Sequence, residues 1–179
     1  MDKIINFQDQ IVEIQDFQST YIILRYQERL YRFDFINKKE AFLKQKEIGN
    51  FSFYQLHPLL INYNESMYDV FLNSKPECPN KFIEDIKYSI NYIIQEWRSW
   101  KSYIEFDSGI TYDVFLQNLH KGSGKLMRVP ISIMEKLKEL TDQNNIKISY
   151  FGEKKFSQNQ LIMINNQYII AENFRLHLI

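Results

Sequence analysis

The sequence contains few of the residues that break or cross-link a chain. Of its 179 residues, 5 are glycine, 4 are proline and 1 is cysteine. The single cysteine, Cys78, excludes an internal disulfide and is typical of a protein from a reducing compartment. Scarce glycine argues against the many glycine turns of a large Rossmann or barrel enzyme. The 14 Phe and 12 Tyr argue against disorder.

The chain also lacks an excess of charge of either sign. Lys and Arg number 22, Asp and Glu number 22, and the formal net charge is zero. Because binding of nucleic acid depends on a cationic surface that neutralises phosphates, we expect no nucleic-acid partner. No apolar run of about eighteen residues occurs, and the first ten residues, MDKIINFQDQ, have no apolar signal-peptide core. We therefore expect a cytoplasmic protein that does not cross a membrane.

The residue spacings of common catalytic and metal sites are missing as well. The three histidines, His57, His120 and His177, are far apart and have no cysteine beside them, so we expect no metal site. The segment Gly122 to Lys125 is not a phosphate-binding loop, because leucine stands where GxxxxGK begins. It has no GxSxG spacing either. Carboxylate pairs occur no more often than chance gives in a chain that is 25% charged. We predict no catalytic residue and no cofactor.

Apolar periodicity predicts strands at both ends of the chain and helices between them. This order, without repeated βαβ alternation, predicts one α+β domain over residues 1–179: an antiparallel or mixed sheet from both ends of the chain, with one long and one shorter helix packed on it. The expected strands are Ile11 to Phe17, Tyr21 to Tyr26, Leu30 to Ile36, Phe51 to Leu56, Met67 to Asn73, Ile146 to Phe151, Leu161 to Ile164 and Tyr168 to Leu178. Two segments stay open: Asn37 to Ile48 is a short charged helix or a mobile connection, and Ile110 to Leu119 is helix or strand.

The longest helical rhythm runs from Asn80 to Tyr103. Apolar residues recur there at three- and four-residue steps, which places them on one face of a helix. They are Ile83, Ile86, Ile90, Ile93, Ile94 and Trp97. We expect this face to pack on the sheet. The shorter helix should follow from Ser132, because Ser132 and Glu135 have capping-box spacing.

The opposite face of the long helix is aromatic. At about 100° per residue, Tyr88, Tyr92 and Tyr103 point away from the isoleucines. One interpretation is a helix covered on both sides within its domain. The other is an exposed tyrosine surface that binds another protein, since tyrosine supplies a rigid apolar ring and a hydroxyl. Arg98, in the string Trp97-Arg98-Ser99-Trp100, either pairs at that surface or is simply solvated.

A second candidate surface is cationic. Lys121 lies just before the glycine-bearing segment Gly122 to Gly124, and Lys125 and Arg128 lie just after it. This segment is either a flexible turn between two elements or a cationic loop that meets an acidic partner surface or an anion.

Several stretches together resemble a family. They are HPLLINYNE (His57 to Glu65), EWRSW (Glu96 to Trp100), KGSGKLMRVP (Lys121 to Pro130) and NNQYIIAENF (Asn165 to Phe174). In this order the chain, over roughly residues 51–179, is similar to small bacterial immunity-type proteins, which shield a cell from its own toxins. The resemblance implies a partner protein, a cognate toxin, and carries no catalytic residue. Many such proteins are acidic because their nuclease toxins are basic, and the zero net charge departs from that pattern.

Two classes of function follow. The first is a binding protein that occludes a partner through the tyrosines and the cationic segment. The second is a small-molecule enzyme or ligand-binding protein with a pocket between sheet and helices, whose polar groups include His57, His120 and Asp107. A flat aromatic patch would favour the first class, and a deep pocket with converging polar groups would favour the second.

Overall fold

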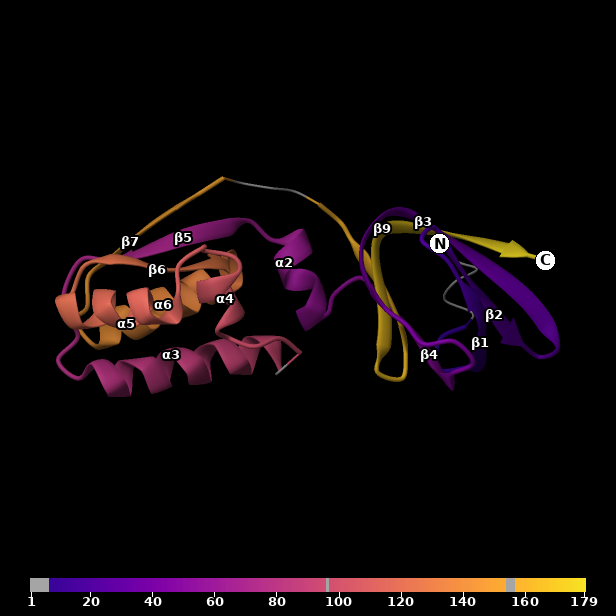
Figure 1. Ribbon diagram of the computed structural model, residues 1–179, viewed down its shortest axis with the longest axis horizontal. Coiled ribbons are helices and arrows are strands. Elements are labelled where there is room, and N and C mark those ends of the chain that lie inside the picture. The colour runs from indigo at the N-terminus through magenta and orange to yellow at the C-terminus, as the bar shows by residue number, and fades with distance from the viewer. Residues whose placement is uncertain (1–6, 96, 154–156) are drawn as a thin grey trace. The chain divides into compact units, whose positions relative to one another are not determined.

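The computed structural model divides the chain into two compact units (Figure 1). Residues Met1–Tyr63 and Ser157–Ile179 form the first unit, and Asn64–Phe156 form the second. The structure describes residues 7–95, 97–153 and 157–179. Each unit encloses an apolar cluster of its own residues, so the described chain has separate cores where the composition led us to expect one.

The first unit is a closed barrel of six strands. Its order is β1-β2-β3-β9-β8-β4, and every neighbouring pair is antiparallel. The strands are β1 (Ile11–Phe17), β2 (Tyr21–Tyr26), β3 (Arg29–Phe42), β4 (Ile48–Tyr54), β8 (Gln160–Ile164) and β9 (Gln167–Leu178). Both ends of the chain therefore contribute to one sheet, because β9 pairs with β3 and β8 pairs with β4.

Alternation along the strands fills the barrel with side chains. Ile22, Leu24 and Phe33 are fully buried, whereas their neighbours Ile23, Arg32 and Asp34 are only partly buried. Phe7 closes the interior, with its ring centroid 5.8 Å from those of Phe33 and Phe51. The barrel interior is thus a packed core and holds no channel among these residues.

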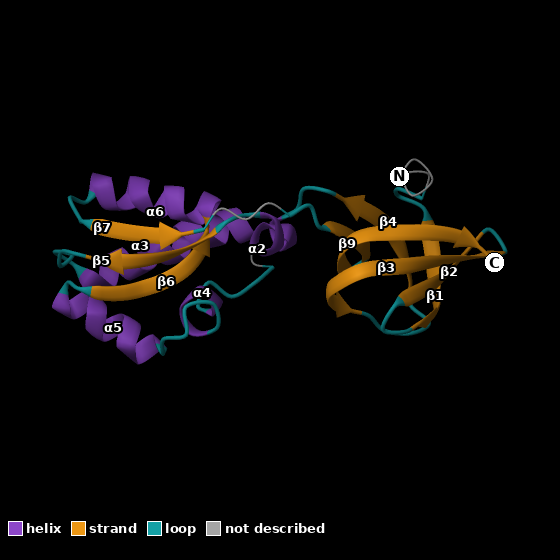
Figure 2. Cartoon of the chain, turned by 90° about the horizontal axis from the view of Figure 1, so that it is seen from above, coloured by secondary structure: helices purple, strands orange, loops and turns teal. Residues whose placement is uncertain are grey.

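The second unit is a three-stranded antiparallel sheet with helices on one face. Its order is β6-β5-β7, with β5 in the middle. Figure 1 shows the strands along one side of this unit and α3, α5 and α6 on the other, and Figure 2 looks onto the strands. The elements are β5 (Met67–Leu72), α3 (Pro79–Ile94), α4 (Ser102–Glu105), α5 (Tyr112–Lys121), β6 (Gly124–Pro130), α6 (Ile131–Gln143) and β7 (Ile148–Gly152). A short 3-10 turn, η1 (Pro58–Leu60), and α2 (Ile61–Asn64) precede them.

The isoleucine face of α3 lies in the core of the second unit. Ile86 and Ile90 are fully buried together with Phe115 and Leu119 of α5 and Ile133 of α6. The predicted face is confirmed for the residues up to Ile94. Burial of one such aliphatic side chain is worth about 1.5–3 kcal/mol, so this face holds the helix in place.

The shorter helix begins differently from the prediction. The expected capping box of Ser132 and Glu135 is wrong, because α6 begins at Ile131. The residue before it, Pro130, has no side chain that accepts a hydrogen bond from the helix N-terminus. The backbone N–H of Ser132 instead donates to a carboxylate oxygen of Glu65 at 2.9 Å. A carboxylate from a different part of the chain thus satisfies the helix N-terminus, where the dipole favours negative charge.

The α+β class and the antiparallel sheet from both chain ends are confirmed. The prediction that both helices pack on that sheet is wrong, because they pack on the separate sheet β6-β5-β7. The helix expected to reach Tyr103 ends at Ile94, and the segment after Asn37 continues strand β3 to Phe42. The single domain predicted over residues 1–179 stays a prediction, since compactness does not test whether the units unfold together.

We expect Ile90→Asp to unfold the second unit, because it places a charge among fully buried apolar side chains. The destabilisation should be at least about 4 kcal/mol. Tyr88→Asp is the matched control: it introduces the same side chain on the opposite, exposed face and should cost about 0.5 kcal/mol or less. Both tryptophans, Trp97 and Trp100, belong to this unit, so fluorescence-detected urea unfolding measures it. A parent-like midpoint for Ile90→Asp would contradict the face assignment.

Candidate functional site

The outer face of α3 carries two exposed tyrosines. Tyr88 is 75% exposed and Tyr92 is 74% exposed, and they lie one helical turn apart. The two tyrosines share a face of the helix because they are four residues apart, and this face points away from the buried isoleucines. Of the two alternatives open from the sequence, the structure therefore supports the exposed tyrosine surface for this pair.

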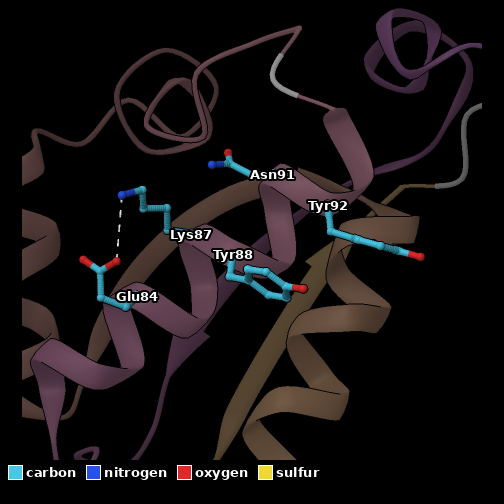
Figure 3. A pocket seen from close by; sticks show the side chains of 5 residues that line it. All are labelled: Glu84, Lys87, Tyr88, Asn91 and Tyr92. Carbon is cyan, nitrogen blue, oxygen red and sulfur yellow. Dashed lines mark ion pairs between the residues drawn. The ribbon is translucent and has the colours of Figure 1, made fainter.

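These tyrosines border a surface hollow of about 400 Å³ (Figure 3). The described residues that line it come from one face of α3: Glu84, Lys87, Tyr88, Asn91 and Tyr92. We call this set the tyrosine surface. Their spacing from Glu84, at steps of three, four, seven and eight residues, is the helical pattern of one face, so the sequence contained a signal for Glu84, Lys87 and Asn91 that we did not use.

The tyrosine surface is electrically neutral. Glu84 and Lys87 form an ion pair at 3.8 Å, which balances the two charges of the surface. On α6, Lys136 and Glu139 form a second pair at 2.7 Å. Helix α6 contacts α3, and the hydrogen bond and the charge of Glu139 raise the pKa of Lys136. The whole area offers aromatic rings, hydroxyls and an amide without excess charge.

Tyr103, the third predicted tyrosine, lies elsewhere. Helix α3 is terminated by Gln95, whose φ of 50° places it in the left-handed region. The chain then reverses, and α4 buries Tyr103 at 1% exposure in the core. Its placement on the outer face is wrong, because the helical phase counted from Ile83 no longer applies after residue 95. Burial raises the pKa of the Tyr103 hydroxyl far above its ordinary range.

The two tryptophans also lie beyond the end of α3, and the structure buries one and partly exposes the other. Trp97 is 37% exposed, whereas Trp100 is 7% exposed and packs with its ring edge-on to Tyr112 and Phe115. The prediction that Trp97 shares the isoleucine face is therefore wrong. Glu96, the first residue of the EWRSW string, lies outside the described residues.

Arg98 contacts two side chains of its own unit. Its guanidinium lies 3.1 Å from Oδ2 of Asp107 and donates to Oδ1 at 3.2 Å. It also lies 5.1 Å from the ring centroid of Tyr103, within the range of a cation–π contact. Arg98 thus ties the segment after α3 to the turn before α5, which is the pairing alternative and not the solvated one.

The segment of the predicted cationic loop joins α5 to β6. Gly122 is the C-cap of α5, with φ of 80°, and its N–H donates to the carbonyl of Asn118. A Cβ at Gly122 would lie 2.5 Å from the backbone nitrogen of Lys75, so only glycine fits this close approach. Strand β6 begins at Gly124. Gly122 and Ser123 thus form a short turn between two elements, as the first alternative had it, whereas a cationic loop that meets a partner stays a prediction.

Its three cations are not equivalent. Lys125 Nζ lies 2.8 Å from Oδ1 of Asp69 and donates to the carbonyl of Ser108 at 2.9 Å. Arg128, opposite Asp69 across the β5–β6 pair, reaches Oδ2 at 3.6 Å. Lys121 is exposed at the end of α5. Asp69, which sequence reasoning did not single out as a partner, therefore binds two of the three predicted cations.

The groups proposed for an enzyme pocket belong to different elements with structural roles. His57 lies in the first unit, where its Nδ1 accepts from the backbone of Leu59 and burial lowers its pKa. His120 is exposed near the end of α5, and Asp107 pairs with Arg98. Between helices and sheet of the second unit, the described side chains form a buried core.

Two further properties bear on the class of protein. Among the described residues, no group of three His, Cys, Asp or Glu side chains is arranged to hold a metal ion. Within the same ranges, every helix is too short or too polar to cross a bilayer.

Comparisons with known proteins give no relative from which a role could be transferred. No protein-family model, no curated protein and no solved structure matches the chain.

Lys125→Ala should lower the stability of the second unit by about 1–3 kcal/mol, because it leaves a largely buried carboxylate without its nearest cation. Oδ1 of Asp69 is inaccessible to solvent and lies 2.8 Å from the ammonium of Lys125. Lys121→Ala, four residues earlier and exposed, is the control and should be neutral. Urea unfolding measures both. Equal midpoints would show that the Asp69 contact does not matter.

A titration tests the Arg98–Asp107 pair. Burial raises the pKa of Asp107 above its ordinary 3.8, while the charge and hydrogen bond of Arg98 and the charge of Arg128 lower it. Arg98→Ala should therefore raise this pKa further, as followed by carbon NMR of the carboxyl, and Lys101→Ala should leave it unchanged. Between 3.8 and the raised value the folded protein binds more protons than the unfolded one. The stability of the parent relative to Asp107→Asn should therefore fall as pH rises through that interval. A carboxyl that titrates below 3.8 would refute the assignment.

Proposed function

We propose that this protein binds another protein through the tyrosine surface of α3 and acts by occluding it, in the manner of an immunity-type protein that neutralises a toxin in the cytoplasm. One observation carries the proposal. Tyr88 and Tyr92 are each about three-quarters exposed on a helix whose opposite face is in the core. Large aromatic side chains are usually buried, and exposed ones that share a face are typical of protein interfaces.

The rigidity of the helix supports this use. The tyrosines are presented by a helix of 16 residues, four of whose isoleucines are buried. A partner would therefore bind a surface that is already in place, with little loss of conformational entropy on binding. Tyrosine also loses little rotamer freedom when it becomes ordered, and it is enriched among residues that dominate binding energy.

The neutrality of the surface indicates the chemistry of the partner. With Glu84 paired to Lys87, the surface has no charge to complement a strongly cationic patch. The partner should contact it with a neutral, partly apolar area that offers hydrogen-bond acceptors and donors to the tyrosine hydroxyls and to Asn91. A basic nuclease face is a poor match, which agrees with the zero net charge of the chain.

The ion pairs of the predicted cationic site residues agree with a protein that acts by occlusion. Arg98, Lys125 and Arg128 are engaged with Asp107 and Asp69, and these pairs tie elements of the second unit together. The proposed binding function therefore uses affinity alone and requires no reacting group. The enzyme alternative is the weaker proposal, because the three groups it would use, His57, His120 and Asp107, lie on separate elements and Asp107 pairs with Arg98.

The test begins with a search for a toxin gene beside the gene for this chain; a candidate found there is co-expressed and then purified with it. Tyr92→Ala should raise the dissociation rate constant by about thirtyfold, which corresponds to about 2 kcal/mol, and Tyr88→Ala should act in the same direction. Surface plasmon resonance measures the rate, and growth of the co-expressing cells reports protection. Tyr92→Phe should retain most of the affinity, because it keeps the ring.

Leu56→Ala is the control for exposed apolar area, since Leu56 is 90% exposed in the first unit, away from α3 in the sequence. It should bind as the parent does. Parent-like binding by both tyrosine variants would overturn the proposed surface. A sharp drop in the melting temperature of Tyr92→Ala would instead show that the tyrosine is part of the core.

A further inference from the structure

Strand β7 forms an edge of the sheet in the second unit. It pairs with β5 on one side, and no strand in the described part of the chain pairs with its other side. The opposite edge, β6, is different, because Asn118 of α5 donates to the carbonyl of Lys125 there at 2.8 Å. An open edge presents backbone donors and acceptors in a row, which another strand can bind.

The pairing with β5 shows which backbone groups of β7 point outward. The N–H of Asn73 donates to the carbonyl of Lys147 at 2.8 Å, so residue 147 faces β5. Antiparallel pairing alternates, and residues 149 and 151 therefore also face β5. The backbone groups of Ile148, Tyr150 and Gly152 consequently point away from the sheet.

We infer that a second copy of this chain occupies this edge, with β7 paired antiparallel to β7 so that two three-stranded sheets become one. The two copies would be related by a two-fold axis perpendicular to the sheet. Such an axis keeps each side chain on its own face, so a residue can pair only with itself or with one an even number of positions away. This condition leaves few registers.

Charge selects one of these registers. Lys147 and Glu153, at the two ends of the strand, are both exposed, on the same face as Phe151. When Tyr150 lies opposite its own copy, Lys147 lies opposite Glu153 of the second copy, and symmetry produces this contact twice. The symmetric registers centred on Ser149 or Phe151 separate the two charges. Opposite charges directly across a strand pair are favourable, and like charges are unfavourable.

The same register uses the rest of the strand. All three outward residues, Ile148, Tyr150 and Gly152, find an outward residue opposite them, which makes the backbone pairing as complete as the strand allows. Phe151, 66% exposed, lies across from Ser149 of the second copy on the open face of the sheet. Tyr150, 38% exposed and edge-on to Tyr68 at 6.1 Å, meets its own copy on the other face. Charged residues often protect an edge strand from pairing, but in this register Lys147 of each copy faces Glu153 of the other.

Sedimentation velocity over a concentration series tests the inference on the full chain. The parent should dimerise reversibly below about 0.5 mM. Lys147→Glu and Glu153→Lys should each weaken the dimer about tenfold or more, because two attractive contacts become repulsive. An equimolar mixture of the two variants should form a heterodimer of parent-like affinity, since each introduced charge then faces its opposite. The double variant should regain the homodimer.

Lys138→Glu is the matched control, because it makes the same charge change at an exposed position of α6 and should leave the dimer unchanged. Tyr92→Ala should also dimerise as the parent does, so this inference and the proposed function can fail separately. A parent that stays monomeric to about 0.5 mM, or a mixture of the two charge variants that gains no affinity over either alone, overturns the inference. A dimer that Tyr92→Ala abolishes would instead place the contact on α3.

Discussion

The burial of one face of α3 is the interaction on which the rest of the second unit depends. Ile86 and Ile90 are fully buried among side chains from α5 and α6. A helix with one face in a core points its opposite face away from that core, so burial of these isoleucines also determines which way Tyr88 and Tyr92 point. The candidate binding surface is in this sense a consequence of core packing, and no separate structural element is needed to present it.

A second constraint acts at the strands. Asp69, on the central strand, contacts both Lys125 and Arg128 of β6, while Arg98 and Asp107 join the segments on either side of α4. These partly buried pairs hold cations that the sequence alone suggested were available to a partner. The two candidate surfaces inferred from sequence therefore differ: the tyrosines have exposed rings, whereas two of the cations are occupied within the fold.

Strand positions were predictable because strands of a barrel alternate. The pattern over Ile11–Phe17 and Tyr21–Tyr26 marks those strands at the residues where the structure has them. The continuation of β3 to Phe42 was not predictable, because it includes the charged, exposed residues 38–40 and its partner, β9, comes more than a hundred residues later. This segment is a strand because it pairs with a neighbouring strand, and its local sequence preference does not explain it.

The sequence by itself determined the apolar face of α3, the direction of Tyr88 and Tyr92 away from that face, the α+β class and the neutral charge. Each of these depends on local periodicity or on composition. Only the tertiary structure decided that α3 ends at Ile94, that Tyr103 and Trp100 turn inward, and that Asp69 holds Lys125. The physical reason is that a left-handed Gln95 has no strong local signal, and an ion pair between distant segments depends on strand register, which no periodicity within either segment encodes.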